Sequence, residues 1–200
     1  MVDALIELGS VCIAVDKGSS WGSRAAQRLH EQAEGVWQRR IPGLETMGSR
    51  DARGAPSLIH PRGGLPGERD LGPVRLVGWA KRPDGRSGPL LHAKLLVLCV
   101  AWTWENDGGG WDDLLTPLWV WSGSANWTEA AKGHVELGMW SKDERLAEEA
   151  LRFLADVLRI SEPWSQPSGV PAPEMVEAAW DDDAFVEHLA EMLEVDEDEP

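Results

Sequence analysis

The sequence lacks several features that mark specialised classes of protein. It contains no tyrosine, two phenylalanines and two cysteines in 200 residues. No apolar run reaches the roughly 18 residues that a membrane-spanning helix requires, so we expect no membrane insertion. The N-terminus has no basic start and carries Asp3 and Glu7, which argues against a secretory signal peptide. Cys12 and Cys99 lie in apolar surroundings without metal-ligand spacing, so we expect two reduced, buried thiols in a cytoplasmic protein.

Lysine and arginine are absent from the C-terminal part of the chain. Residues 161–200 hold 13 acidic residues and no base, and the whole chain has a net charge of −15. Residues 17–94 hold 14 bases and 7 acids. This basic half suits a phosphate-bearing partner such as nucleic acid. It is equally compatible with scattered solvated arginines, because the bases form no large local cluster.

Hydrophobic patterning predicts an α/β fold with a mixed central sheet flanked by helices. Apolar runs bounded by turn signals predict strands at 11–16, 74–80, 90–102, 118–122 and 135–140. One helix is expected to begin at Ser20 or Ser23. A second is expected after a capping box formed by Ser141 and Glu144. Its apolar stripe is expected to contain Leu146, Ala150, Phe153, Leu154, Val157 and Leu158.

The distribution of glycine and proline suggests the domain organisation. Residues 41–73 contain 12 glycines or prolines in 33 positions, which predicts a long loop without regular elements. A Pro-rich segment after residue 160 predicts a linker, followed by a weak amphipathic helix over 175–193 and an acidic end. We therefore expect one domain over 1–160 and an acidic helical tail over 161–200.

Tryptophan is unusually frequent. The chain has 12 tryptophans, and seven of them fall between residues 102 and 140. They can fill a core beside the strands, or they can form stacking surfaces for nucleic-acid bases. We favour the core interpretation, because basic and aromatic residues are not interleaved along this stretch.

Two polar side chains share one face of the apolar run 90–102. His92 and Lys94 are two residues apart, and side chains at that spacing in a strand point the same way. A buried ammonium without a partner is strongly disfavoured. We therefore expect this face to open to a functional site.

Further polar residues follow the next predicted strand. Ser124 and Asn126 lie in the small-residue turn Gly-Ser-Ala-Asn, and Glu136 comes ten residues after Asn126. Hydroxyl and amide donors, together with the lysine, suit the non-bridging oxygens of a phosphodiester. The carboxylate can fix the tautomer and orientation of an imidazole. The set predicts phosphate chemistry.

These motifs resemble those of the phospholipase D superfamily. LHAKLLVL followed by WSGSANWTEAAKGHVELGMW is similar to its signature, H-x-K-x4-D, then G-S-x-N, then a glutamate about ten residues later. The resemblance covers about residues 74–160, and the first strand and helix fit the opening of the same domain. It implies a phospholipase D-like fold over 1–160, with one copy of the motif.

The family implies a metal-independent phosphodiesterase that uses no cofactor. One histidine attacks phosphorus to form a phosphohistidine, and a second, from another motif copy, protonates the leaving oxygen and then activates water. By this resemblance His92 is the nucleophile or the acid. Lys94, Ser124 and Asn126 hold the phosphate, and Glu136 orients a histidine.

The chain departs from the family pattern in two ways. Cys99 occupies the position of the family's aspartate, and only one H-x-K is present. A complete site therefore requires a homodimer or a second motif-bearing chain. We favour a nuclease-like activity on DNA or RNA. Two alternatives stay open: a catalytically weak nucleic-acid-binding or assembly module of the same fold, and a phospholipase or phosphatidyl transferase.

Overall fold

The structure, a computed structural model, is a mixed α/β fold. It describes residues 2–20, 23–51, 53–62, 69–79, 84, 91–105, 110–124, 136–164 and 169–196. The helices are α1 (Val2–Ile6), α2 (Lys17–Ser20), α3 (Arg24–Gln32), α4 (Glu144–Arg159) and α5 (Asp182–Asp196), with a 3-10 turn η1 (Gln38–Arg40). None of the helices in the described ranges is long and apolar enough to cross a membrane.

The described strands form four small sheets, where the sequence predicted one central sheet. The strands are β1 (Ile13–Asp16), β2 (Met47–Ser49), β3 (Leu58–Ile59), β4 (Val74–Val77), β5 (Leu95–Glu105), β6 (Trp111–Gly123), β7 (Gly138–Ser141), β8 (Glu162–Pro163), β9 (Met175–Glu177) and β10 (Ala179–Trp180). Their order is β1-β4-β8, β5-β6-β7, β2-β9 and β10-β3. All five predicted strands are present, with shifted ends.

The inner sheet, β1-β4-β8, is covered on both faces. β1 and β4 run parallel, and β8 pairs antiparallel with β4. One face packs on α1 and α3 through a cluster that contains Leu5, Leu29 and Val74. The other face packs on a second cluster, to which α4 contributes Ala155 and Leu158. Burial of both faces explains why β1 and β4 are mostly apolar, with the buried Arg75 in β4 paired with Glu174.

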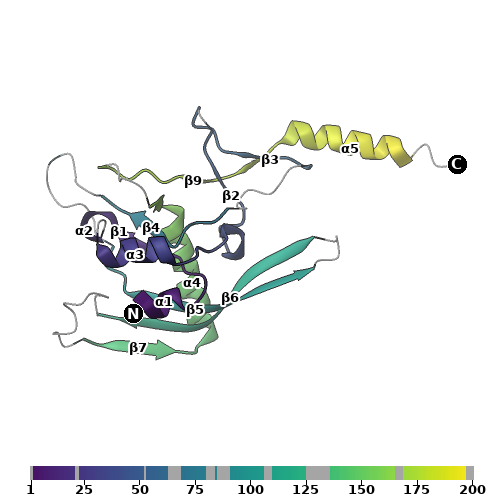
Figure 1. The fold of residues 1–200 in the computed structure, drawn as a ribbon. Coiled ribbons are helices and arrows are strands. Elements are labelled where there is room, and N and C mark those ends of the chain that lie inside the picture. Colours follow the sequence, from purple (N-terminus) through teal and green to yellow (C-terminus); the bar gives the residue numbers. More distant parts are fainter. Residues whose placement is uncertain are drawn as a thin grey trace.

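The outer sheet, β5-β6-β7, is a long antiparallel sheet that lies on the other side of α4 (Figure 1). β5 and β6 pair from Leu95–Ser122 to Glu105–Trp111, with an irregularity at Leu98 and Cys99. Val120 on β6 is buried, and α4 packs against this strand. The sheet therefore turns one face to α4.

Helix α4 differs from the prediction in its cap and its buried stripe. Asp143 caps the helix by accepting a hydrogen bond from the Leu146 N–H at 2.8 Å, whereas Ser141 accepts from the Asp143 N–H. Leu146 and Phe153, expected in the apolar stripe, are exposed. The small side chains of the helix are buried in their place, because α4 lies closely packed between two sheets. The buried residues are Ala147, Ala150, Leu151, Ala155, Val157 and Leu158.

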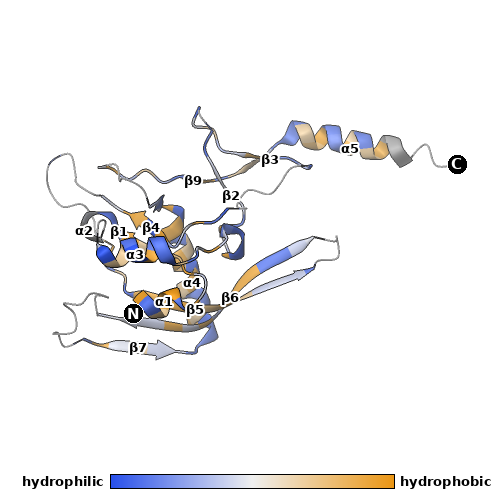
Figure 2. Cartoon of the chain, in the orientation of Figure 1, coloured by the Kyte–Doolittle hydropathy of each residue, from blue (hydrophilic) through white to orange (hydrophobic). Residues whose placement is uncertain are grey.

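Two segments expected to be irregular contribute strands. The Gly/Pro-rich stretch 41–73 contains β2 and β3, which pair with β9 and β10. The segment expected as a linker after residue 160 supplies β8, and β9 and β10 occupy the first part of the stretch 175–193 that was expected to be helical, so that α5 begins only at Asp182. Such short strands have little periodicity of their own, and they form because distant parts of the chain pair with them. Figure 1 shows α5 projecting away from the sheets, and in Figure 2 hydrophobic and hydrophilic residues alternate along it.

The expectation that the tryptophans fill a core is wrong for several of them. Four lie on the outer sheet with about half of their surface exposed: Trp102 (54%), Trp104 (45%), Trp111 (60%) and Trp140 (50%). Trp102, Trp104 and Trp140 are exposed because a sheet that covers α4 with one face leaves alternate side chains on the other. Trp111 has the register of the core-facing Leu115, and it is exposed at the end of the strand where β6 begins.

Candidate phosphate-handling site

One end of the outer sheet brings together three of the residues predicted for the site. The Gly123 N–H donates to the Lys94 carbonyl at 3.3 Å, and Gly123 lies opposite Gly138 on β7. The Ser124 N–H donates to the Leu137 carbonyl at 2.8 Å. Lys94, Ser124 and Glu136 are thereby placed where β5 begins, β6 ends and β7 is about to begin.

The hydroxyl of Ser124 joins the ends of β6 and β7. It donates to Glu136 Oε2 at 2.6 Å and accepts from the Leu137 N–H at 3.1 Å. A short hydrogen bond from a hydroxyl to a carboxylate is charge-assisted and fixes both groups. Glu136, which the resemblance assigns to orienting a histidine, is thus held in place by Ser124.

His92 and Lys94 lie on the segment that leads into β5. His92 is exposed, and Lys94 is half-exposed with its Nζ donating to the His92 carbonyl at 2.8 Å. Lys94 adjoins the Gly123–Ser124 turn through its backbone. We call His92, Lys94, Ser124 and Glu136, which lie at this end of the outer sheet, the polar cluster; its imidazole and ammonium are groups that can react with or bind an anion. Asn126, the remaining predicted phosphate ligand, lies outside the described residues.

Asp16 holds the segment that carries the histidine. Its Oδ2 accepts a hydrogen bond from the Leu91 N–H at 3.2 Å, and Asp16 is 95% buried. Because Asp16 ends β1, this contact ties the inner sheet to the entry of β5, one residue before His92. The sequence analysis did not select Asp16, although an acid at the end of a buried strand was a visible signal.

Tryptophan and glycine pack closely beside the polar cluster. A Cβ on Gly123 would lie 2.7 Å from the Trp121 ring, and one on Gly138 would lie 2.6 Å from Trp121 Nε1. The indole therefore lies directly over the two glycines. Any side chain at either position would displace it, so these glycines allow the close approach of ring and backbone.

Most described arginines of the basic half are paired with acids. Arg28 pairs with Asp3, Arg39 with Asp112, Arg40 with Asp113, Arg62 with Glu191, and Arg69 and Arg75 with Glu174. Their charge is largely neutralised locally. The positive excess of residues 17–94 therefore does not by itself mark a nucleic-acid surface in the described part of the chain.

Cys99, at the position of the family's aspartate, faces away from the site. Odd-numbered positions of β5 point toward α4, as shown by the pairing of Val97 with the buried Val120, whereas Lys94 lies on the other face. Burial raises the pKa of the Cys99 thiol to about 11, so this group is neutral. Both cysteines are free and only half-buried. Among the described residues no three histidine, cysteine or acidic side chains are grouped to hold a metal ion.

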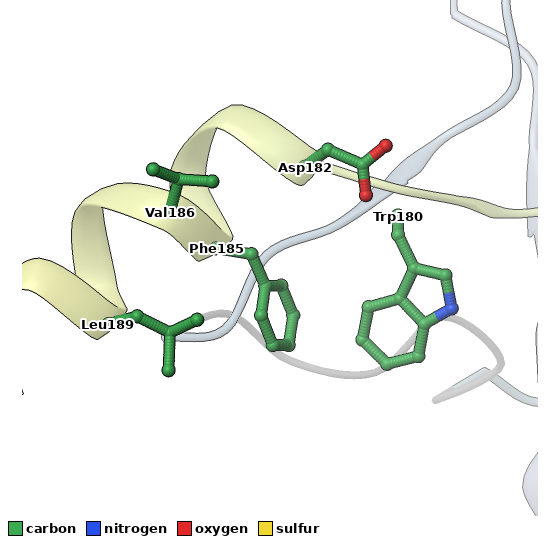
Figure 3. Close-up of a pocket in the computed structure, with 5 residues that line it drawn as sticks. All are labelled: Trp180, Asp182, Phe185, Val186 and Leu189. Atoms are coloured by element: carbon green, nitrogen blue, oxygen red, sulfur yellow. The ribbon is translucent and has the colours of Figure 1, made fainter.

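A hollow of about 580 Å³ lies elsewhere, at the start of α5 (Figure 3). It is lined by Trp180, Asp182, Phe185, Val186 and Leu189, and the rings of Trp180 and Phe185 meet edge to face at 5.2 Å. Its lining is mostly apolar, and it contains none of the residues predicted for phosphate chemistry.

Comparison with known proteins gives no neighbour for this arrangement. No family model, curated protein or solved structure matches the chain. Inferences about function therefore depend on the residues of the chain itself.

Proposed function

We propose that the chain is a phosphodiesterase of phospholipase D type that acts on nucleic acid and requires two copies of its motif. The observation that supports this most directly is that Lys94, Ser124 and Glu136 lie at one end of the outer sheet, where Ser124 hydrogen-bonds Glu136 and the backbone of Lys94 pairs with Gly123, and that His92 lies on the segment leading into this end. These residues span positions 92 to 136 of the sequence, and they are the residues of the resemblance.

The chemistry follows from these groups. His92 attacks phosphorus and forms a P–N bond, while the P–O bond to the leaving group breaks. His92 of a second copy gives its proton to the leaving oxygen. That histidine then takes a proton from water, which attacks phosphorus and releases the first His92. Lys94 offsets the negative charge that develops on the non-bridging oxygens.

The resemblance extends this proposal to a phospholipase D-like fold. Cys99 does not oppose it, since position 99 lies on the α4 side of β5 and not on the side of Lys94. A cysteine in place of an aspartate at this position changes the packing between the sheet and α4 and leaves the polar cluster unaltered.

Hydrolysis of bis(p-nitrophenyl) phosphate tests the proposal. We expect turnover in the presence of EDTA, and a loss of at least about 10³-fold in His92→Ala, because the nucleophile is removed. His188→Ala is the matched control, since His188 lies on α5 and is no part of the site. Unchanged turnover in His92→Ala, or activity only with added metal, would contradict the proposal.

A second candidate function is nucleic-acid binding without turnover. The single H-x-K favours it, because one chain then supplies only half of the catalytic histidines. It predicts salt-sensitive binding that survives His92→Ala, and a wild-type protein that does not hydrolyse the substrate. A strict monomer by light scattering would favour this candidate over the enzyme.

A further inference from the structure

Three tryptophans form a cluster on the outer face of the outer sheet. Trp121 on β6 lies directly opposite Trp140 on β7, and Trp119 precedes Trp121 by two positions on the same face. The rings of Trp119 and Trp140 meet edge to face, with centroids 6.2 Å apart. We call Trp119, Trp121 and Trp140 the tryptophan platform.

A cation lies on this platform. Lys142 Nζ sits 4.1 Å from the centre of the Trp119 ring. Cationic and aromatic groups are therefore interleaved in space, although they are not interleaved along the sequence. The lack of interleaving along the sequence is therefore no argument against a surface on which bases stack.

The platform adjoins the candidate phosphate-handling site. Lys94 lies next to Gly123, whose partner on β7 is Gly138. The pair Trp121–Trp140 is the next pair on the same face, two residues or about 7 Å along the strands. The Trp121 ring itself covers the two glycines. A ligand whose phosphate lies at Lys94 thus has indole surface within reach.

The platform is partly accessible, with Trp119 and Trp121 of intermediate exposure. The opposite face of the sheet packs on α4, and Trp140 is half-exposed. Two chemically different occupants are conceivable: a second copy of the chain and a nucleic acid. Two-fold self-association through this face would bury the Lys142 ammonium of both copies in one interface. A polyanion with flat bases instead complements both the ammonium groups and the rings.

We propose that the tryptophan platform binds bases of single-stranded nucleic acid, with the backbone phosphates at Lys94 and Lys142. The inference depends on the proposed function, and it names single-stranded DNA or RNA as the substrate class of that site. Single strands are required, because the faces of bases within a duplex are already stacked on one another.

Fluorescence anisotropy with labelled oligonucleotides tests this proposal, with His92→Ala as the background so that the ligand stays intact. The probes are oligothymidylate, an abasic oligonucleotide of the same length, and a duplex. Trp140→Ala is expected to weaken oligothymidylate binding about 5- to 150-fold, the usual loss for one stacked base. Binding of the abasic strand, which has the phosphates and no bases, should not change. Binding of the duplex should be weaker than that of oligothymidylate.

Matched variants separate stacking from unfolding. Trp140→Phe keeps an aromatic face and should retain most of the affinity, and Trp180→Ala, an exposed tryptophan on β10, should retain all of it. Lys142→Ala should weaken both single-stranded probes and lower the salt dependence by about one phosphate contact.

Three outcomes would overturn the proposal. In the first, Trp140→Ala binds oligothymidylate as before; in the second, it loses affinity equally for the abasic strand. In the third, it converts a dimer into a monomer by light scattering without affecting DNA binding, which would assign the face to self-association. Failure of hydrolysis in the wild type, together with base-dependent binding, would refute the proposed enzyme and leave the platform intact.

Discussion

The ion pair between Lys17 and Glu162 gives the sharpest test of how the fold is held together. Lys17 Nζ lies 2.5 Å from Glu162 Oε1 and also donates to the Val170 carbonyl at 2.9 Å. The lysine side chain has no exposed surface, and that of Glu162 is 9% exposed. Glu162 additionally accepts from the Ala172 N–H at 2.7 Å. The pair joins the end of β1 to residues 145 positions later.

Removal of one partner leaves a buried charge unpaired, and that costs about 3–5 kcal/mol. For a chain of this size, such a loss lowers the melting temperature by about 6–20 °C. We therefore expect Lys17→Met and Glu162→Leu to be strongly destabilised when made singly. The double variant should be close to the wild type, because replacing both charges by apolar groups removes the desolvation penalty with the attraction.

Urea unfolding followed by circular dichroism measures the four free energies of this cycle. The control is Glu149→Leu, because Glu149 pairs with Arg152 on the exposed surface of α4, where an ion pair contributes about 0–1 kcal/mol. The reasoning fails if each single variant lowers the free energy of unfolding by less than about 1 kcal/mol, or if the two decreases simply add in the double variant.

Two further predictions concern groups near the candidate site and in the core. Asp16→Ala removes the acceptor of the Leu91 N–H, and such a hydrogen bond contributes about 1.5–3 kcal/mol. Hydrogen exchange of the Leu91 amide should therefore accelerate roughly 10- to 150-fold, and turnover by His92 should fall. Asp16→Asn keeps an acceptor and should preserve both, whereas unchanged exchange in Asp16→Ala would refute this contact. Burial raises the pKa of Cys12 to about 12 and of Cys99 to about 11, so the thiolate fraction at pH 8 is about 10⁻⁴ and 10⁻³. Iodoacetamide should therefore react slowly at pH 8 and about tenfold faster per unit up to pH 10, and a rate equal to that of the urea-unfolded chain would contradict this.

The long elements could be predicted from the sequence because their patterns are local. Most of strand β5 coincides with the apolar run 90–102, and α4 follows a turn with capping residues; both patterns are visible in single windows of sequence. The cap itself was misassigned by two residues. Ser141 and Asp143 are both good caps, and the choice depends on where β7 ends, which is a tertiary property.

The short strands could not be predicted, because nothing local defines them. β2 and β9 have three residues each, and they pair across more than 120 positions of chain. Glycine and proline between such segments look like loop in any window. The same limit applies to the tryptophans: the strands that carry them are visible in the sequence, and the face that α4 covers is not.

The sequence indicated where three candidate site residues lie, and it did not indicate the contact made by Asp16. Motif spacing selected Lys94, Ser124 and Glu136, and the antiparallel pairing of β5, β6 and β7 brings them to one end of the sheet. Asp16 was missed, because its role depends on a contact between two sheets. Motif spacing in the sequence can indicate residues that lie on neighbouring strands. Residues that contact each other between two layers of the fold have no fixed spacing in the sequence.

Asp16 and Lys17 are adjacent in sequence and act on opposite parts of the chain. Asp16 accepts from the segment before His92, and Lys17 pairs with Glu162 beyond α4. Because neighbouring residues cannot shift independently, loosening the pair with Glu162 should also disturb the tether to Leu91. We therefore expect the position of His92 to depend on Glu162, which acts on the segment before His92 through the end of β1.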